Sequence, residues 1–197
     1  MDLSKALKIK GRPFEIPDCS RDDLPGFFVE MGFRVGAEIG VYKGEFSEKI
    51  ARTGLNLYSI DPYFPDQEKL GRMYQDVKQL LAPYPKCKII RKTSMEAVGD
   101  FEDRSLDFVY IDGNHEFRYI AEDLSEWTKK VRKGGIVSGD DYFYHKHGTS
   151  KDFWHVAHVL NAYIGAYGIE NWYLLGRKNA LPGEKRDRYR SWMFVKQ

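Results

Sequence analysis

The chain has 197 residues, a formal net charge of +2 and 15% aromatic residues, which suits one domain with a full hydrophobic core. The near balance of charge excludes a strong overall field toward nucleic acid or an anionic membrane. The charged first thirty residues lack the apolar core of a signal peptide, and no apolar run is long enough to span a bilayer. Because the two cysteines, Cys19 and Cys87, form no metal or redox motif, we expect a cytoplasmic protein with free thiols.

Residues 1–33 are predicted to form an N-terminal extension, with a short helix over 22–31. Buried strands are predicted at 34–39, 55–61, 88–91, 106–111 and 136–138, and helices at 45–53, 66–81, 116–132 and, briefly, after Ser94. A helix over 152–166 then leads to two aromatic-rich strands, 171–175 and 191–195, which should form an antiparallel hairpin. This alternation predicts one α/β domain over residues 34–197.

The first predicted strand carries Glu38 near its end and runs through a turn, Gly40 to Gly44, into a helix. Glycines allow a sharp turn and a close approach of a ligand to the main chain. Because the Glu38 carboxylate would repel a pyrophosphate, this turn favours a cationic ligand over a dinucleotide. S-adenosylmethionine, with its ammonium and sulfonium groups, is the candidate. An ordinary tight turn between strand and helix is the alternative.

Asp61 ends the second predicted strand. A nucleoside-binding α/β domain needs a carboxylate near this position, because the tip of its second strand meets the ribose hydroxyls. We therefore predict that Asp61 binds a ribose. The alternative is a turn residue before Pro62.

Four segments carry a family resemblance: Gly36-Ala37-Glu38-Ile39-Gly40-Val41-Tyr42-Lys43-Gly44, Ile60-Asp61, Tyr110-Ile111-Asp112-Gly113-Asn114-His115, and Gly134-Gly135-Ile136-Val137-Ser138-Gly139-Asp140-Asp141-Tyr142. With the order of elements, they resemble the class I S-adenosylmethionine-dependent methyltransferases over about residues 34–197. The combination is similar to the methyltransferase domain 24 group, which is related to metal-dependent O-methyltransferases of sugars and macrolides. The resemblance implies a Rossmann-like fold: a mostly parallel seven-stranded sheet, helices on both faces and an antiparallel C-terminal hairpin.

The same resemblance implies which residues bind the cofactor. The methionine end would meet the glycine turn, the ribose would meet the second strand, and the adenine would lie after the third strand. The residues implied are Glu38, Gly40, Tyr42, Gly44, Asp61, Ser94, Met95 and Asp112. For Ser94 the alternative is a helix N-cap, with Glu96 in the first helical turn.

Three acids follow two neighbouring predicted strands: Asp112 after one, and Asp140 and Asp141 after the other. Strand ends of a parallel sheet line one crevice, and crowded carboxylates repel one another unless a cation neutralises them. Hard cations such as Mg²⁺ take oxygen ligands of this kind, so we predict a magnesium site. The alternative is separate roles for the three acids.

The general base is a further question. The related sugar-modifying enzymes have an acid where this chain has Asn114, and an amide cannot accept a proton. His115 is the candidate base, beside Asp112 as the second catalytic residue, because imidazole titrates near neutral pH. His145 and His147 are rivals, and His115 could instead cap a helix or contact the cofactor. His155 and His158 are expected to be packing or surface residues.

Three functions fit these observations. O-methylation of a small molecule such as a sugar or polyol is favoured by the acid triplet, with an aromatic acceptor mouth of Tyr142, Phe143, Tyr144, Phe153 and Trp154. A nucleic-acid methyltransferase is supported only by Lys185, Arg186, Arg188 and Arg190, which acids interrupt, so a nucleic-acid partner is not expected. A non-catalytic S-adenosylmethionine-binding protein is the third. Membrane association is not expected, and a homo-oligomer is compatible with the sequence, which does not specify the oligomeric state.

Overall fold

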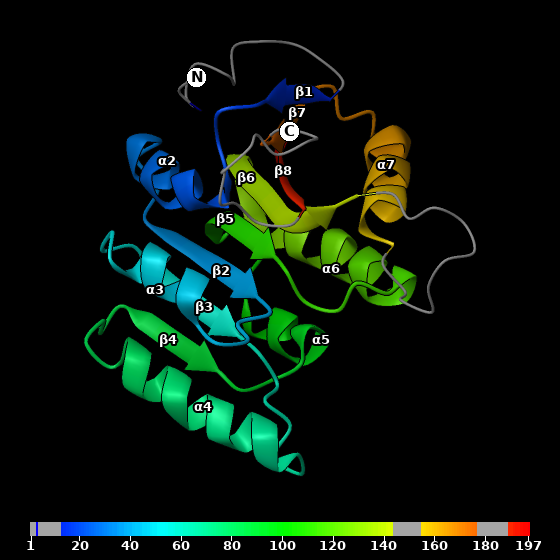
Figure 1. Cartoon of the computed structure of the whole chain (residues 1–197). Coiled ribbons are helices and arrows are strands. Elements are labelled where there is room, and N and C mark those ends of the chain that lie inside the picture. The colour runs from blue at the N-terminus through cyan, green and yellow to red at the C-terminus, as the bar shows by residue number, and fades with distance from the viewer. Residues whose placement is uncertain (1–2, 4–12, 144–154, 177–188) are drawn as a thin grey trace, which may run out of the picture.

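The computed structural model describes residue 3 and residues 13–143, 155–176 and 189–197. The described part forms one eight-stranded sheet with the order β1-β7-β8-β6-β5-β2-β3-β4 (Figure 1). The strands are β1 (Phe14–Ile16), β2 (Val35–Ile39), β3 (Asn56–Ile60), β4 (Cys87–Ile90), β5 (Leu106–Ile111), β6 (Val131–Tyr142), β7 (Trp172–Leu175) and β8 (Arg190–Val195). Only β8 runs antiparallel to its neighbours, β6 and β7.

Helices cover both faces of this sheet (Figure 1). One face carries α2 (Leu24–Glu30), α3 (Glu45–Ala51) and α4 (Glu68–Leu81), and the other carries α5 (Ser94–Ala97), α6 (Phe117–Lys130) and α7 (Val156–Tyr167). Two 3-10 turns, Arg21–Asp23 and Val98–Asp100, complete the elements. Among these residues no helix combines the length and apolar character needed to cross a bilayer.

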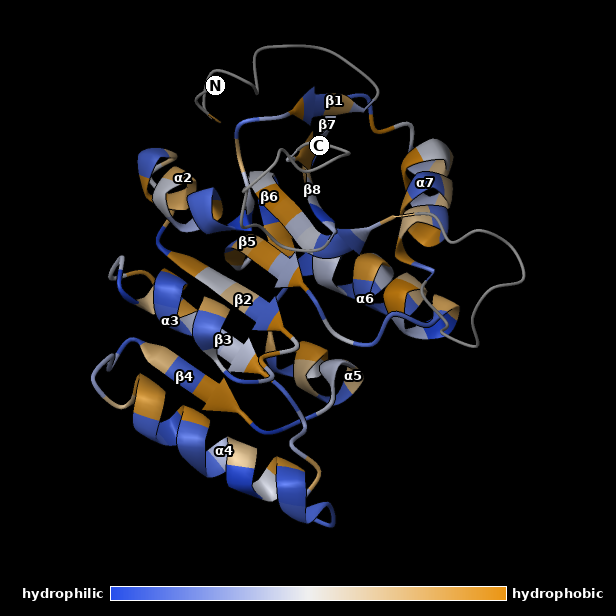
Figure 2. Ribbon diagram, in the orientation of Figure 1, coloured by the Kyte–Doolittle hydropathy of each residue, from blue (hydrophilic) through white to orange (hydrophobic). Residues whose placement is uncertain are grey.

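The apolar pattern of each helix explains its packing. In α6, Ile120, Leu124 and Trp127 recur at helical spacing, and all three are buried against the sheet. In α2, Phe28 stacks on Phe108 of β5 with ring centroids 3.9 Å apart. Figure 2 shows the result as orange stripes facing the sheet and blue stripes facing outward. The sheet is therefore enclosed between two apolar layers, and its strand ends remain available for a site.

The structure confirms the expected class I methyltransferase fold, with one more strand than the seven expected. The added strand, β1, pairs in parallel with β7 at the edge of the sheet. At three residues it is too short to show an alternating pattern, so the sequence did not reveal it. The boundary between an extension and a domain at residue 33 stays a prediction.

Strand β6 is much longer than the expected 136–138. It begins directly after α6 and reaches Tyr142, with its pairing to β5 shifted in register between Leu106 and Phe108. Gly134 and Gly135 were expected to separate a helix from a strand, yet both lie inside β6. Glycine inside a strand often marks a β-bulge, and the register shift between β5 and β6 lets the strand continue through both glycines.

We predict that Gly139→Ala destabilises the protein by about 1 to 3 kcal/mol or more, because the sheet leaves no room there. A Cβ at Gly139 would lie 2.3 Å from the Ile111 carbonyl oxygen and 2.5 Å from the Trp192 ring. Gly165→Ala in α7 is the control, since a Cβ there meets nothing within 4 Å. Chemical denaturation should show the control equal to or slightly above wild type. Equal stability of the two variants would contradict the packing around Gly139.

Candidate active site

The candidate site lies where β2, β3, β5 and β6 end at their carboxyl termini. The parallel register aligns Ile39 with Ile111, and Ile111 with Gly139. The residues that follow these positions, Gly40, Asp112 and Asp140, therefore share one edge of the sheet. Ligands of open α/β sheets bind at this edge, at the point where the strand order reverses. Here that point is β2, with β3 and β4 on one side of it and β5 and β6 on the other.

The turn after β2 is packed against the main chain that follows β5. Gly40 has φ +87, and a Cβ on it would lie only 2.1 Å from the Asp112 carbonyl oxygen. The Asp112 amide donates to the Ile39 carbonyl at 2.8 Å, and the Gly40 amide donates to Ile60 at 2.9 Å. Gly44 then caps α3 with φ +78. Position 40 requires glycine, because no side chain fits between this turn and the main chain of Asp112.

Asp61 holds this turn from the side of β3. Its carboxylate accepts hydrogen bonds from the amides of Val41, Tyr42 and Tyr63, each at 3.0 Å. The Tyr63 hydroxyl adds a bond to the Tyr42 carbonyl at 2.8 Å. Tyr42 itself is 60% exposed, with φ +51. A carboxylate offers about four acceptor positions, so Asp61 supports the turn and retains capacity for one ribose hydroxyl. Its ribose role stays a prediction.

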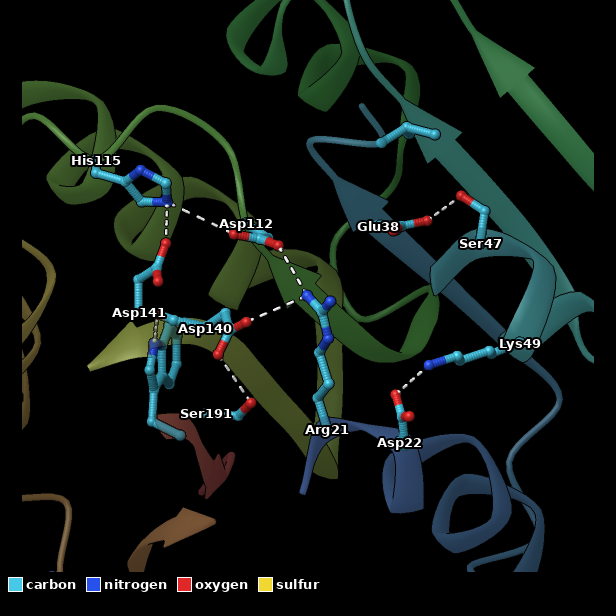
Figure 3. A network of polar contacts seen from close by, with 12 residues as sticks. Arg21, Asp22, Glu38, Ser47, Lys49, Asp112, His115, Asp140, Asp141 and Ser191 are labelled. Carbon is cyan, nitrogen blue, oxygen red and sulfur yellow. Dashed lines mark hydrogen bonds and ion pairs between the residues drawn. The ribbon is translucent and has the colours of Figure 1, made fainter. Parts of the chain in front are cut away.

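Glu38 is buried beneath α3 rather than open at the turn. Its side chain is 2% exposed and accepts a hydrogen bond from Ser47, which in turn accepts one from Ser59 at 2.9 Å (Figure 3). Burial raises the pKa of Glu38 to about 8, against the lowering effect of the Ser47 bond. At neutral pH Glu38 is therefore mostly the neutral acid, which a nearby cationic ligand would help to ionise.

Three acids and two cations meet at the ends of β5 and β6 (Figure 3). His115 Nε2 lies 2.9 Å from Asp141 Oδ2 and 3.5 Å from Asp112 Oδ1. Arg21 Nη1 lies 3.2 Å from Asp140 Oδ2 and 3.6 Å from Asp112 Oδ2. The charges alternate along the cluster, so that each carboxylate has a cationic neighbour.

A bulge at the end of β6 directs two consecutive acids into the same cluster. Neighbouring residues of a regular strand point to opposite faces, but the register of β6 against β8 shifts between Gly139 and Tyr142. Asp141 has φ +61, a conformation that costs energy for a residue with a side chain. Asp140 also accepts from the Ser191 hydroxyl at 2.9 Å. Such bulges commonly direct side chains at functional sites.

The cluster shifts the proton affinity of its members. Burial lowers the pKa of His115, but hydrogen bonds to Asp112 and Asp141 outweigh it and raise this pKa to about 9. Burial raises the pKa of Asp112 and raises that of Asp140 to about 7. In this arrangement His115 is an imidazolium at neutral pH. It can accept a proton only after it has released its own, so its role as a base stays a prediction.

The predicted metal set is only partly brought together. Among the described residues, the groups placed for a common cation are Asp112, His115 and Asp141, whose ligand atoms lie within 4.8 Å of one another. Asp140 instead faces Arg21 and Ser191. Sequence reasoning missed Arg21 altogether, because nothing in the local pattern of residues 20–23 beyond a capping box marks a site residue.

The expected adenine segment after β4 has a different local role for Ser94. Thr93 is the N-cap of α5, in a capping box with Glu96, so the alternative assignment of Ser94 as the cap is wrong. The Ser94 hydroxyl donates to Asp123 and accepts from Trp127 Nε1, the latter at 2.7 Å. Burial raises the pKa of Asp123 to about 7. Met95 packs partly buried against the core, and adenine contact for this segment stays a prediction.

Several candidate residues lie outside the described residues: Tyr144, His145, His147, Phe153, Trp154, Lys185, Arg186 and Arg188. Of the others, Arg190 pairs with Glu15 at 2.7 Å. His155 has the structural role expected of it: its Nδ1 accepts from the Phe117 amide at 3.0 Å, and its amide donates to the His115 carbonyl at 2.8 Å. Asn114 accepts from the Glu116 amide, which makes it a turn residue.

Comparison with known proteins agrees with this geometry. A family model described as a methyltransferase domain matches residues 37–142, more than half of the chain and the segment that holds the glycine turn and the acid cluster. The chain belongs to this family. Its fold is that of the class I S-adenosylmethionine-dependent methyltransferases, as expected from the sequence.

Solved structures share the fold at low sequence identity. An O-methyltransferase from Bacillus cereus, in complex with S-adenosylhomocysteine, aligns with a TM-score of 0.63 and 16% identity over 89% of this chain and 80% of its own. TomG from Streptomyces achromogenes is an O-methyltransferase of tomaymycin synthesis in complex with S-adenosylmethionine. It aligns with a TM-score of 0.64 and 16% identity over 90% of this chain and 79% of its own. The N-methyltransferase NodS from Bradyrhizobium japonicum aligns with a TM-score of 0.59 and 16% identity over 89% of this chain and 94% of its own.

One curated protein matches part of the sequence. The uncharacterized protein y4gI from Sinorhizobium fredii is 33% identical over 61 residues, which is 31% of this chain and 7% of that protein. The chain thus spans a small fraction of that relative's length. Because both oxygen- and nitrogen-methylating enzymes share the fold, the acceptor must be argued from this site.

We predict that stability depends on pH through Glu38. Its folded-state pKa of about 8 lies above the usual 4.5, so the folded state retains a proton that the unfolded state releases. The stabilisation is complete below about pH 4.5 and is lost as pH rises through about 8. Glu38→Gln should remove this dependence and gain stability over wild type at pH 8.5, by an amount on the order of a few kcal/mol. Denaturation at several pH values measures it.

The exposed Glu30→Gln serves as the control, and its pH dependence should match that of wild type. If Glu38→Gln kept the same slope between pH 5 and 8, Glu38 would already be ionised in the folded protein. Its pKa would then lie near the ordinary range.

Proposed function

We propose that this protein transfers the methyl group of S-adenosylmethionine to an oxygen of a small-molecule acceptor, a sugar or another polyol. In the reaction the bond between sulfur and methyl breaks, the bond between methyl and acceptor oxygen forms, and the acceptor loses its proton. One observation carries the proposal: the glycine turn and the cluster of acids share the Gly40–Asp112 contact. A cofactor on the turn would thus have its reacting end beside the acids.

The residues of the turn are suited to hold the cofactor. The Asp61 and Tyr63 bonds fix the backbone of the turn before any ligand arrives, which reduces the entropy lost on binding. The exposed Tyr42 ring is available to cover a ligand on the turn. The carboxyl groups of Glu38 and Asp112 lie at this end of the sheet, and a ligand that carries ammonium and sulfonium groups would favour their ionised forms.

The acid cluster suits a divalent cation with a revised set of ligands. We infer that Asp112, His115 and Asp141 would hold it, in place of the three acids first expected. Two carboxylates and an imidazole are ligands for first-row ions such as Mn²⁺, whereas Mg²⁺ prefers oxygen alone. When bound, such a cation positions acceptor oxygens and lowers the pKa of the attacking one. His115 must release its proton to act as a ligand, so cation binding and proton release are coupled.

The polyol acceptor is favoured by the polarity of the cluster. Vicinal hydroxyls can approach carboxylates and a cation together, and they gain hydrogen bonds that an apolar acceptor would leave unmade. A nucleic-acid substrate finds less support, because Arg190, the described member of the basic segment, is paired with Glu15. A non-catalytic cofactor-binding role is distinguished by experiment: binding of cofactor with no turnover on a panel of sugars and polyols would favour it.

Asp61→Ala should weaken the binding of S-adenosylhomocysteine by about 1 to 3 kcal/mol. The substitution removes the ribose acceptor and leaves three turn amides without their partner. Titration calorimetry measures the loss, and Asp66→Ala, an exposed acid in the following loop, should bind as wild type does. No binding to wild type would overturn the cofactor assignment. Equal binding of Asp61→Ala would move the ribose elsewhere.

Asp141→Asn should lower the affinity for Mn²⁺ at least about tenfold, since a carboxylate ligand becomes a neutral amide. Affinity for S-adenosylhomocysteine should stay within about twofold of wild type, because Asp61 and Tyr63 brace the turn whereas Asp141 faces His115. Mn²⁺ binding is followed by electron paramagnetic resonance, with Asp76→Asn on the surface of α4 as the control. Unchanged Mn²⁺ affinity, together with turnover that is indifferent to a chelator, would sink the cation site.

A further inference from the structure

We propose that Arg21 is the permanent cation of the acid cluster, a positioning residue that reserves Asp140 and leaves room for one divalent ion on the His115 side. The proposal rests on the proposed function, because it concerns how many divalent cations the proposed site binds and how tightly. It assigns a role in the site to the segment before α2. The sequence alone gave that segment none.

The contacts of Arg21 are those of a residue built into the site. Its Nη1 reaches Asp140 Oδ2 at 3.2 Å and Asp112 Oδ2 at 3.6 Å, so one nitrogen bridges two carboxylates (Figure 3). Its guanidinium lies 5.7 Å from the ring centroid of Phe46, in cation–π range. The Arg21 side chain is 23% exposed and the Asp140 side chain only 7%. Pairs of this burial are screened by salt far less than surface pairs.

Local structure holds Arg21 in this place. Ser20 opens the 3-10 turn Arg21–Asp23 with a capping box that uses the Asp23 carboxylate. The next residue, Asp22, pairs with Lys49 of α3 at 2.5 Å. The turn is thereby fixed against the helix that follows the glycine turn. Arg21 points from it toward the strand ends, as Figure 3 shows.

Asp140 is committed to partners other than a metal. Its Oδ1 accepts from Ser191 at 2.9 Å, its Oδ2 accepts from Arg21, and its carbonyl accepts from Trp192 Nε1 at 3.0 Å. A metal ion on Asp140 would lie beside a guanidinium that cannot lose its charge, and the two cations would repel each other. Asp112 is different, because its Oδ1 faces His115 at 3.5 Å, and the ligand atoms of Asp112, His115 and Asp141 lie within 4.8 Å of one another.

The charge balance explains why such a residue is useful. Without Arg21, the three clustered carboxylates would attract more than one divalent ion, or hold one too tightly to let substrate oxygens compete for it. A fixed positive charge beside Asp112 and Asp140 reduces the negative potential of the cluster without occupying a ligand position. We therefore expect Arg21 to limit divalent cation binding to one weaker site.

The experiment compares Mn²⁺ affinity among variants of the full chain by electron paramagnetic resonance. Arg21→Met removes the charge while keeping an unbranched side chain, and should bind Mn²⁺ about tenfold more tightly or at one additional site. Arg21→Lys keeps the charge and should stay near wild type. Arg52→Met is the matched control, because it removes an exposed arginine that pairs with Glu48 at 2.8 Å rather than with the cluster, and it should leave Mn²⁺ affinity unchanged.

The possible results separate this proposal from the proposed function. S-adenosylhomocysteine calorimetry on the same samples reports the cofactor site independently. If wild type binds no Mn²⁺, the cation site fails, while a site gained in Arg21→Met still supports Arg21 as the neutralising charge. Equal Mn²⁺ binding in Arg21→Met and wild type, including none in either, overturns the role of Arg21. An equal increase in Arg52→Met overturns it as well.

Arg21→Met leaves buried carboxylates without a partner, and the variant could fail to fold for that reason. The double variant R21M/D140N removes both charges of the closest pair. It should fold and return Mn²⁺ affinity to near the wild-type value. If neither the single nor the double variant folds, Arg21 acts through packing, and the proposal is wrong.

Discussion

The contact between Gly40 and the main chain of Asp112 is the constraint on which the rest of the site depends. A Cβ at position 40 would lie 2.1 Å from the Asp112 carbonyl oxygen, so the two strand ends can meet only if residue 40 is glycine. Two hydrogen bonds complete the contact: the Asp112 amide donates to the Ile39 carbonyl, and the Gly40 amide donates to the Ile60 carbonyl. The turn after β2 and the first acid of the cluster therefore have a fixed separation before any ligand binds.

Around this contact the protein balances charge in three ways. Glu38 is buried and takes a proton, His115 carries a removable positive charge between two acids, and Arg21 carries a permanent one. Each device reduces the repulsion that crowded carboxylates would otherwise exert. They differ in whether the charge can change: Glu38 and His115 can gain or lose a proton, whereas the guanidinium of Arg21 keeps its charge. The cluster thus has built-in positions where charge can change and one where it cannot.

The sequence predicted the parts of this arrangement that follow from strand order. Glu38, Gly40, Asp61 and Asp112 all lie at or next to the ends of buried strands, and parallel pairing brings such ends to one edge. It could not predict Arg21, because that residue meets Asp140 across 119 positions of the chain and from a segment with no strand pattern.

The sequence also could not predict backbone conformations that its residues disfavour. The left-handed Asp141 and the bulge of β6 change which side chains lie together, and neither has a local signal in Gly139-Asp140-Asp141-Tyr142. The turn-bracing role of Asp61 was weighed only as an alternative to ribose binding, yet a carboxylate has capacity for both. The two halves of the site consequently differ in origin: backbone pairing determines the position of the glycine turn, whereas the acid cluster depends on side chains that the bulge and the segment before α2 direct inward. Because one fold serves many acceptors, the acid cluster, and not the fold, is the part of this chain from which an acceptor has to be argued.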